Sequence, residues 1–171
     1  MPFIDNDFEK YVSKKMERFS LSKTKTSYLA DNAFASMKYL TDIRIQNNRI
    51  SMLKRSMFTN YSMIETFLFN GNRIQEIPDD MFSQMPYLLR VGLDDNNISI
   101  LPESVFKHCY DKLISLLLSG NPIQCDCSLQ WIVNRKQNRH DKYLTGTCVS
   151  PKHNDGTELR DLVKQDFLFC L

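Results

Sequence analysis

A repeat of about 24 residues is the feature that most constrains how this chain can fold. Four asparagines mark the repeat, and they lie 24, 24 and 25 residues apart: Asn48, Asn72, Asn96 and Asn121. Apolar side chains stand three and five residues before each asparagine, and an isoleucine stands two residues after it. The first such set is Ile43, Ile45 and Ile50. A fixed period of this length indicates an array of stacked units, each of which contacts only its neighbours.

The spacing inside each unit predicts its local structure. Apolar residues two apart form a short strand with one buried face. The amide of the asparagine that follows can both donate to and accept from the backbone of a turn, so we expect an asparagine ladder beside a parallel sheet. Three phenylalanines recur with the same period and are expected to fill the interior from the opposite side: Phe58, Phe82 and Phe106. A helical bundle does not explain this strict copying, and a curved solenoid does.

The sequence divides into three parts. Residues 1–15 read as a partial, irregular N-terminal repeat, and residues 16–124 as about five repeats that start near Met16, Leu40, Ile64, Leu88 and Leu113. Residues 125–171 break the pattern and carry four of the five cysteines. The first residues show no basic-then-apolar signal segment, which suggests a fragment, a truncated gene model or a short isoform. We expect no membrane span in this chain, because no apolar run reaches about 18 residues.

The repeats resemble a known family. The segments LTDIRIQNNRISML, IETFLFNGNRIQEIP, LLRVGLDDNNISILP and LISLLLSGNPI are similar to the 24-residue leucine-rich repeats of extracellular receptors and matrix proteins. The resemblance covers roughly residues 13–124, although Thr24 stands where the first asparagine is expected. It implies a β-dominated α/β horseshoe with short parallel strands on the concave face. Irregular or short 3-10 segments are expected on the convex side, followed by a small disulfide-bonded, helix-containing C-terminal cap.

The C-terminal cysteines are Cys125, Cys127, Cys148 and Cys170. A bond between the first two would be strained, which leaves two possible pairings. A zinc site is the alternative, but C-x-C is not its usual ligand spacing. The pattern NPIQCDC followed by L-x-W resembles the cysteine-rich cap of secreted leucine-rich repeat proteins such as Slit, Toll receptors and the Nogo receptor. That resemblance implies the pairs Cys125–Cys148 and Cys127–Cys170.

Inside the cap, residues 128–138 are expected to form a short helix, and Thr157 is expected to start another helical turn. The fifth cysteine, Cys109, occupies the repeat position of Met37, Tyr61 and Met85, which predicts a buried free thiol.

The outward positions of the strands are the candidate binding site, because this architecture binds its partners on the concave face. Apolar residues gather there in the C-terminal half, with charged residues around them, and such a cluster marks an interaction site. The predicted partner-binding residues are Arg44, Leu68, Leu89, Arg90, Asp94, Ile114 and Leu117.

Two weaker candidate sites lie elsewhere in the sequence. Arg135, Lys136 and Arg139 form a basic run that could bind a sulfated glycan, or could be a solvated helix face. Asn60 and Asn97 each begin an N-glycosylation sequon.

These features predict a non-catalytic extracellular module that binds a protein ligand or receptor, with no cofactor. The net charge of +2 gives no reason to expect a nucleic-acid partner. The three histidines form no recurring set with serine or carboxylate residues, so we do not expect an enzyme. Two alternatives remain. One is a non-catalytic accessory subunit of a secreted enzyme, as in a crustacean luciferase complex that the repeats resemble, and the other is a cytosolic scaffold.

The state of the cysteines separates the extracellular reading from the cytosolic one. Disulfides persist in oxidising compartments. We therefore expect non-reducing peptide mapping of the protein from its natural source to recover two cystine-linked peptide pairs and one free thiol. Five free thiols would favour the cytosolic scaffold.

Overall fold

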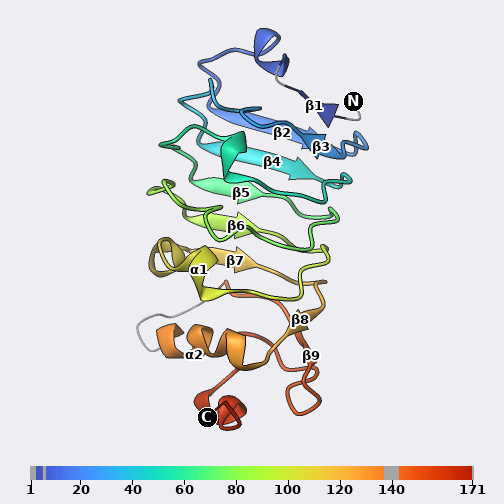
Figure 1. The fold of residues 1–171 in the computed structure, drawn as a ribbon, viewed down its shortest axis with the longest axis vertical. Coiled ribbons are helices and arrows are strands. Elements are labelled where there is room, and N and C mark those ends of the chain that lie inside the picture. Colours follow the sequence, from blue (N-terminus) through green and yellow to red (C-terminus); the bar gives the residue numbers. More distant parts are fainter. Residues whose placement is uncertain (1–2, 6, 137–142, 171) are drawn as a thin grey trace.

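The computed structural model describes residues 3–5, 7–136 and 143–170. Its centre is a parallel sheet in which each strand is followed by the strand of the next repeat (Figure 1). The five strands, in order, are β2 (Arg18–Ser22), β4 (Asp42–Gln46), β5 (Thr66–Leu68), β6 (Arg90–Gly92) and β7 (Ser115–Leu117). Equivalent repeat positions are paired throughout, as in Ile43 with Phe67 and Phe67 with Val91. The predicted solenoid of parallel strands is confirmed.

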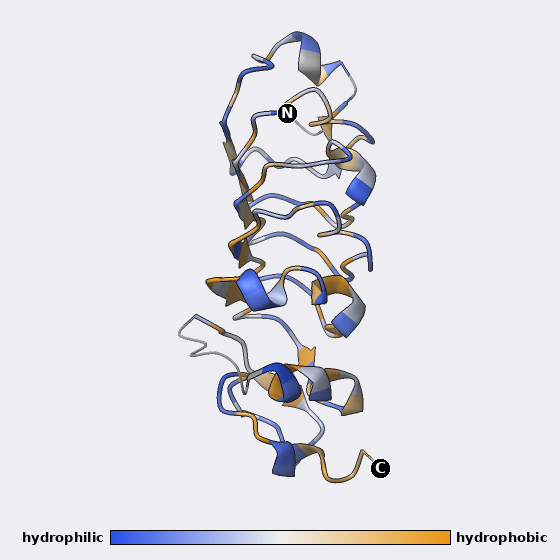
Figure 2. Ribbon diagram, turned by 90° about the vertical axis from the view of Figure 1, so that its left-hand side faces the viewer, coloured by the Kyte–Doolittle hydropathy of each residue, from blue (hydrophilic) through white to orange (hydrophobic). Residues whose placement is uncertain are grey.

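Short helical segments lie on the side of the stack opposite the sheet (Figure 2). They include η2 (Arg55–Met57) and α1 (Glu103–Phe106). The other two short helices of the repeats are η1 (Phe8–Lys10) and η3 (Tyr110–Lys112), and η3 leads into β7. Two small parallel pairs complete the repeats and the cap: β1 (Phe3–Ile4) with β3 (Tyr28–Leu29), and β8 (Ile123–Gln124) with β9 (Cys148–Ser150). The cap adds η4 (Cys127–Leu129), α2 (Gln130–Lys136) and η5 (Lys164–Phe167).

The cap differs from its sequence-based prediction in one element. Glu158 forms an isolated β-bridge with Thr147, residues 159–161 form a single turn, and the next helical segment is η5. The physical reason is that their backbone is already paired with residues 146–148. The Leu159 N–H donates to the Gly146 carbonyl at 2.9 Å, and the Cys148 N–H donates to the Thr157 carbonyl at 2.9 Å. The other predicted helix is present as η4 followed by α2, and residues 137–138 lie outside the described residues.

The asparagine side chains connect neighbouring coils. The Asn96 Nδ2 group donates to the carbonyls of Leu93 in its own coil (2.9 Å) and Phe69 in the preceding coil (3.1 Å). Its Oδ1 atom accepts from the Ile74 N–H at 3.0 Å. Asn72 and Asn121 make the equivalent three bonds, so each amide satisfies backbone groups that would otherwise be buried without partners.

At the N-terminal end of the ladder, a threonine replaces the asparagine. Thr24 stands at the asparagine position, and its hydroxyl donates to the Oδ1 atom of Asn48 at 2.9 Å. The backbone N–H groups of Thr24 and Thr26 donate to the same oxygen, at 3.0 and 3.2 Å. Thr24 therefore ends the ladder with a side chain that cannot extend it to another coil.

A left-handed residue stands immediately before each ladder position and turns the chain out of the strand. These residues are Lys23 (φ 56°), Asn47 (φ 54°), Gly71 (φ 68°), Asp95 (φ 53°) and Gly120 (φ 70°). Asparagine, aspartate and glycine tolerate this conformation best. Gly71 is also required by space, because a Cβ atom there would lie 2.6 Å from the Asn47 Oδ1 atom.

An aromatic column runs through the core. Phe34 stacks on Phe58 with ring centroids 5.5 Å apart, and Phe82 contacts Phe106 at 5.7 Å. Phe67 connects these two pairs, at 6.0 Å from Phe58 and 5.6 Å from Phe82. In the cap, Trp131 stacks on Phe106 at 5.8 Å, and its indole N–H donates to the Leu101 carbonyl at 2.8 Å. The cap thus continues the column and shields its last ring from solvent.

The ladder predicts a large difference between two adjacent asparagines. Asn96→Ala leaves the Ile74 N–H without a partner, while the Leu93 and Phe69 carbonyls each lose one of two amide donors. A buried unsatisfied group costs about 1–3 kcal/mol. We expect the free energy of unfolding to fall by about 1–3 kcal/mol in urea titrations followed by Trp131 fluorescence. In protein that carries no N-linked glycan, the exposed neighbour Asn97 is the matched control, and Asn97→Ala should change stability by less than about 0.5 kcal/mol. Equal losses in the two variants would contradict the role of the ladder.

Candidate functional site

The candidate site is the sheet face, defined as the outward side chains of β2 and β4–β7 together with the residue just before each strand. The structure distributes the predicted residues unevenly over it. Arg44, Arg90 and Ile114 are exposed, and the Ile114 side chain shows 45% of its surface. Leu68, Leu89, Asp94 and Leu117 are half-buried. All seven residues lie on the sheet or at its edges, in four adjacent coils.

The apolar part of the sheet face spans β5 to β7. In the sheet register Leu68 is the neighbour of Gly92, and Gly92 is the neighbour of Leu117. A Cβ atom on Gly92 would lie 2.6 Å from the Leu68 Cδ2 atom, so the missing side chain gives Leu68 room over β6. Leu89 and Ile114 are held side by side at the strand entrances, because the Ile114 N–H donates to the Leu89 carbonyl at 2.7 Å.

The charged part of the sheet face lies over β2 to β6. Arg44 forms two hydrogen bonds of 2.7 Å to the Asp42 carboxylate, and this interaction raises the pKa of the Arg44 guanidinium. Beside the pair is a shallow depression of about 280 Å³ whose lining includes Arg18, Glu65 and Arg90. Neither Arg18 nor Arg90 forms an ion pair with another described residue, so both guanidinium groups can meet an acidic group of a partner.

Asp94 was expected to contact a partner, but its carboxylate is bonded to other residues of this chain. Its carboxylate accepts from the Ser119 N–H at 2.9 Å and from the Asn70 side-chain amide. Burial raises the pKa of Asp94, and the hydrogen bond from Ser119 partly opposes that effect. The carboxylate therefore joins three successive coils, and its bonds within the protein compete with any partner.

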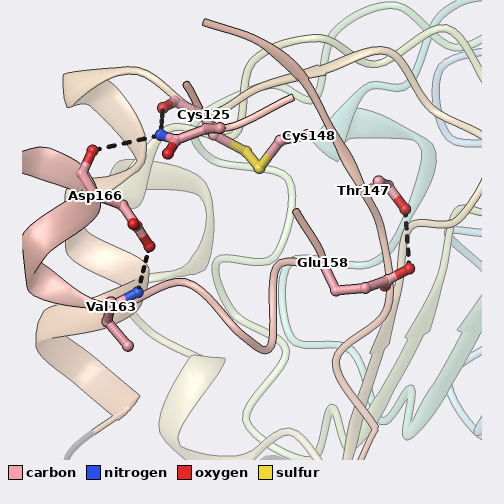
Figure 3. The surroundings of a disulfide bond; sticks show 7 residues. Cys125, Thr147, Cys148, Glu158, Val163 and Asp166 are labelled. Carbon is pink, nitrogen blue, oxygen red and sulfur yellow. Dashed lines mark hydrogen bonds between the residues drawn. A yellow bond between two sulfur atoms is a disulfide. The ribbon is translucent and has the colours of Figure 1, made fainter. Parts of the chain in front are cut away.

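The cap holds the last coil through two disulfides. Cys125 is bonded to Cys148 (Figure 3), with Cα atoms 5.6 Å apart. Cys127 is bonded to Cys170, with Cα atoms 5.3 Å apart, and the two bonds are the pairing that the family resemblance implies. Asn154 lies beside the first disulfide and is 1% exposed. Its amide donates to the carbonyls of Cys125 (3.0 Å) and Asp166 (3.4 Å). No sequence pattern pointed to Asn154, because its partners come from distant segments.

The predicted basic run is only partly within the described structure. Arg135 donates to Glu103 at 2.9 Å and to Asp111 at 3.2 Å, so it ties α2 to the last repeat. The hydrogen bond to Glu103 is the main cause of a raised pKa at Arg135. The Lys136 side chain and Arg139 lie outside the described residues. The cation that can be described is thus already paired with carboxylates of this chain.

Cys109 is buried, with 2% of its surface exposed, as its repeat position predicts. Burial raises the pKa of its thiol to about 12. The equivalent residue Tyr61 differs from its expected core position: it is 54% exposed and contacts Tyr87 edge to face at 6.4 Å. Ser62 is buried in its place, which moves the larger ring outward.

Metal-binding clusters and membrane-spanning helices are both absent from the part of the chain that the structure describes. The described residues contain no group of three or more histidine, cysteine or acidic side chains placed to hold a metal ion. They also contain no helix long and apolar enough to cross a membrane.

A parallel-stranded solenoid of 24-residue coils, closed by a cap with two disulfides, defines a leucine-rich repeat protein of the extracellular type. The family comparison agrees: residues 6–121 match the model of the BspA type leucine rich repeat region in six copies, and the chain belongs to this family. The match begins at residue 6, within the segment that reads as an irregular N-terminal repeat. Leucine-rich repeat domains are typically non-catalytic modules for protein interaction.

Curated relatives and a solved structure support the class. The chain is 35% identical over 54 residues to the leucine-rich repeat and immunoglobulin-like domain-containing nogo receptor-interacting protein 1 of Xenopus tropicalis, covering 32% of this chain and 9% of that protein. The Homo sapiens protein of the same name is 35% identical over 49 residues, covering 29% and 8%. The match thus spans less than a tenth of the length of these relatives.

The solved structure is a chain of the octameric complex of Latrophilin 3, Unc5D and FLRT2, in which FLRT2 is the leucine-rich repeat component. The TM-score is 0.71 at 23% identity, over 84% of this chain and 43% of that chain. This likeness shows the fold.

The buried thiol yields a pH-dependent prediction. Only a thiolate reacts readily, and the raised pKa of Cys109 keeps it protonated well above neutral pH. We expect native protein to incorporate almost no iodoacetamide at pH 7 to 9, and protein unfolded in guanidinium to incorporate one equivalent per chain. Labelling of the native protein that rises through pH 8 to 9 would show that Cys109 is accessible.

Proposed function

We propose that this protein is a non-catalytic extracellular recognition module that binds the ectodomain of a cell-surface receptor through its sheet face. The observation that carries the proposal is the partly exposed apolar group of Leu68, Leu89, Ile114 and Leu117 on a sheet held rigid by the ladder. Protein interfaces combine such an apolar centre with a polar rim, and arginine is enriched in them relative to the rest of the surface. Arg44 and Arg90 supply that rim on the N-terminal side.

The rigidity of the sheet favours binding with little change of shape. Each coil is joined to the next by strand pairing and by the asparagine amides, and a preorganised face loses little conformational entropy on binding. Ile114 is 45% exposed and lies at the entrance of β7, where a partner can cover it without disturbing the core. The proposed mechanism is therefore equilibrium binding to a surface that is already formed.

Compartment and partner class rest on two further observations. Two disulfides fit an oxidising environment. The similar proteins include ones named for interaction with the Nogo receptor, and the structural neighbour was solved with Latrophilin 3 and Unc5D. We extend to this chain only the shared class of partner, which is a protein at the cell surface.

Two substitutions at the apolar centre test the proposal. Leu89→Glu combined with Leu117→Glu places two carboxylates where a partner must exclude water, and losing a central contact costs about 2 kcal/mol or more. We expect binding to a receptor-ectodomain array to weaken at least about 30-fold, measured by biolayer interferometry on each responding ectodomain. Wild-type affinity in the double variant would exclude the sheet face as the binding site.

The matched control carries the same charges away from the sheet face. Met52 and Leu168 are 60% and 69% exposed, so Met52→Glu combined with Leu168→Glu adds two carboxylates at little cost to stability. This control should keep wild-type binding. Both variants should keep two disulfides and a wild-type unfolding temperature. Weaker binding by the Leu89→Glu, Leu117→Glu variant would then reflect lost contacts with the partner and not a loss of folded protein.

A further inference from the structure

A second surface with exposed apolar side chains lies on the flank of the solenoid, where the carboxyl ends of the strands turn toward the convex side. The chain segments there form their own stacking bonds: the Asn97 N–H donates to the Ile74 carbonyl, and the Gln124 N–H donates to the Ser99 carbonyl, both at 2.8 Å. The flank is on the right in Figure 1, beside β8 and β9. It is distinct from the sheet face.

A groove of about 790 Å³ runs along this flank from the third repeat to the cap. Ile100 and Val149 line it and are 50% and 49% exposed. Pro78 and Pro102 add apolar surface, and Gln75 and Gln124 place amides along the same groove. Exposed apolar residues that gather in a groove usually mark a binding site for a ligand or another molecule.

One residue that lines the groove is also the acceptor of a glycosylation sequon. Asn97 is exposed, and both Asn97 and Ser99 of the triplet Asn97–Ser99 line the groove. A glycan attached to Asn97 would start inside the groove and needs no further encounter to reach Ile100. Because the Asn97 side chain alone tethers the glycan to the protein, the effective concentration of the sugar in the groove is high.

We propose that an N-linked glycan on Asn97 lies in this groove and covers Ile100 and Val149. The proposal rests on the extracellular location given under the proposed function, because the modification takes place in the secretory pathway. A pyranose ring suits the site chemically. The C–H groups on its faces can pack on the aliphatic side chains and prolines, while its hydroxyl and acetamido groups can hydrogen-bond to Gln75 and Gln124.

The second sequon provides an internal comparison. Asn60 is exposed in a depression of about 530 Å³ on the convex side, whose lining includes Arg55 and Asp80. No aliphatic side chain lines that depression, and its exposed ring, Tyr61, already contacts Tyr87 edge to face. A glycan there has charged neighbours to contact, and we expect it to remain in solvent. Neither sequon lies on the sheet face, so both glycans would leave that face open to a partner.

The test is a double-mutant cycle on protein secreted from yeast behind a cleavable leader. The forms compared are wild type, Asn97→Gln, Ile100→Ser with Val149→Ser, and all three substitutions together. We expect mass spectrometry to find Asn97 occupied. Asn97→Gln should lower the unfolding temperature by about 2–4 °C in the wild-type background and by less than about 1 °C in the serine background. Asn60→Gln should have the same small effect in both backgrounds.

A direct contact measurement accompanies the cycle and needs no apolar substitution. In methyl-labelled wild-type protein, nuclear Overhauser effects should join the first sugar to the Ile100 and Val149 methyl groups. The proposal is overturned by an unoccupied Asn97 in secreted, disulfide-bonded protein, by equal effects of Asn97→Gln in the two backgrounds, or by absent methyl contacts. Those results would leave binding through the sheet face unaffected, because that binding is measured with variants of other residues.

Discussion

The hydrogen bonds of one buried amide per coil hold this structure together. Each ladder asparagine donates to its own coil and the coil before it, and it accepts an N–H from the preceding coil, as Asn96 does with Leu93, Phe69 and Ile74. An aliphatic side chain of similar size could fill the space but would leave the Ile74 N–H unpaired and remove one amide donor from each carbonyl, at a cost that burial makes large. The strand register, the left-handed turn before each asparagine and the flat array of outward side chains all depend on this repeated bond set.

Stacking buries the apolar side chains of the inner coils, but the first and last coils each have one side that no further repeat covers. At the C-terminal end the cap pairs with β7, because the Leu116 N–H donates to the Tyr143 carbonyl and the Thr145 N–H donates to the Leu116 carbonyl. Trp131 covers Phe106, and the two disulfides hold the covering segments in place. At the other end Leu21 is half-buried, whereas its counterpart Ile45 is fully buried, since the described residues place a strand on one side of β2 only.

The candidate site was predictable in position and only partly in detail. Period and alternation identified the residues of the sheet face, and Ile114 and Arg90 are exposed as expected. Alternation could not show that Asp94 turns its carboxylate to Ser119 and Asn70, since those partners come from neighbouring coils. It also gave no reason to notice Gly92, whose missing side chain makes room for Leu68. In the cap, where no repeat guides the alignment, a helical turn was expected in residues that pair with another segment.

By itself, the sequence determined the solenoid, the place of each strand in the five-stranded sheet, the asparagine ladder and the buried position of Cys109. It could do so because a repeated pattern ties local spacing to the same neighbours in every coil. The tertiary structure alone decided which outward residues remain available, how Asn154 and Arg135 fasten the cap, and that Asn97 shares a groove with Ile100 and Val149. These features arise from segments far apart in the chain, and nothing in their local sequence records which side chains the fold will bring together.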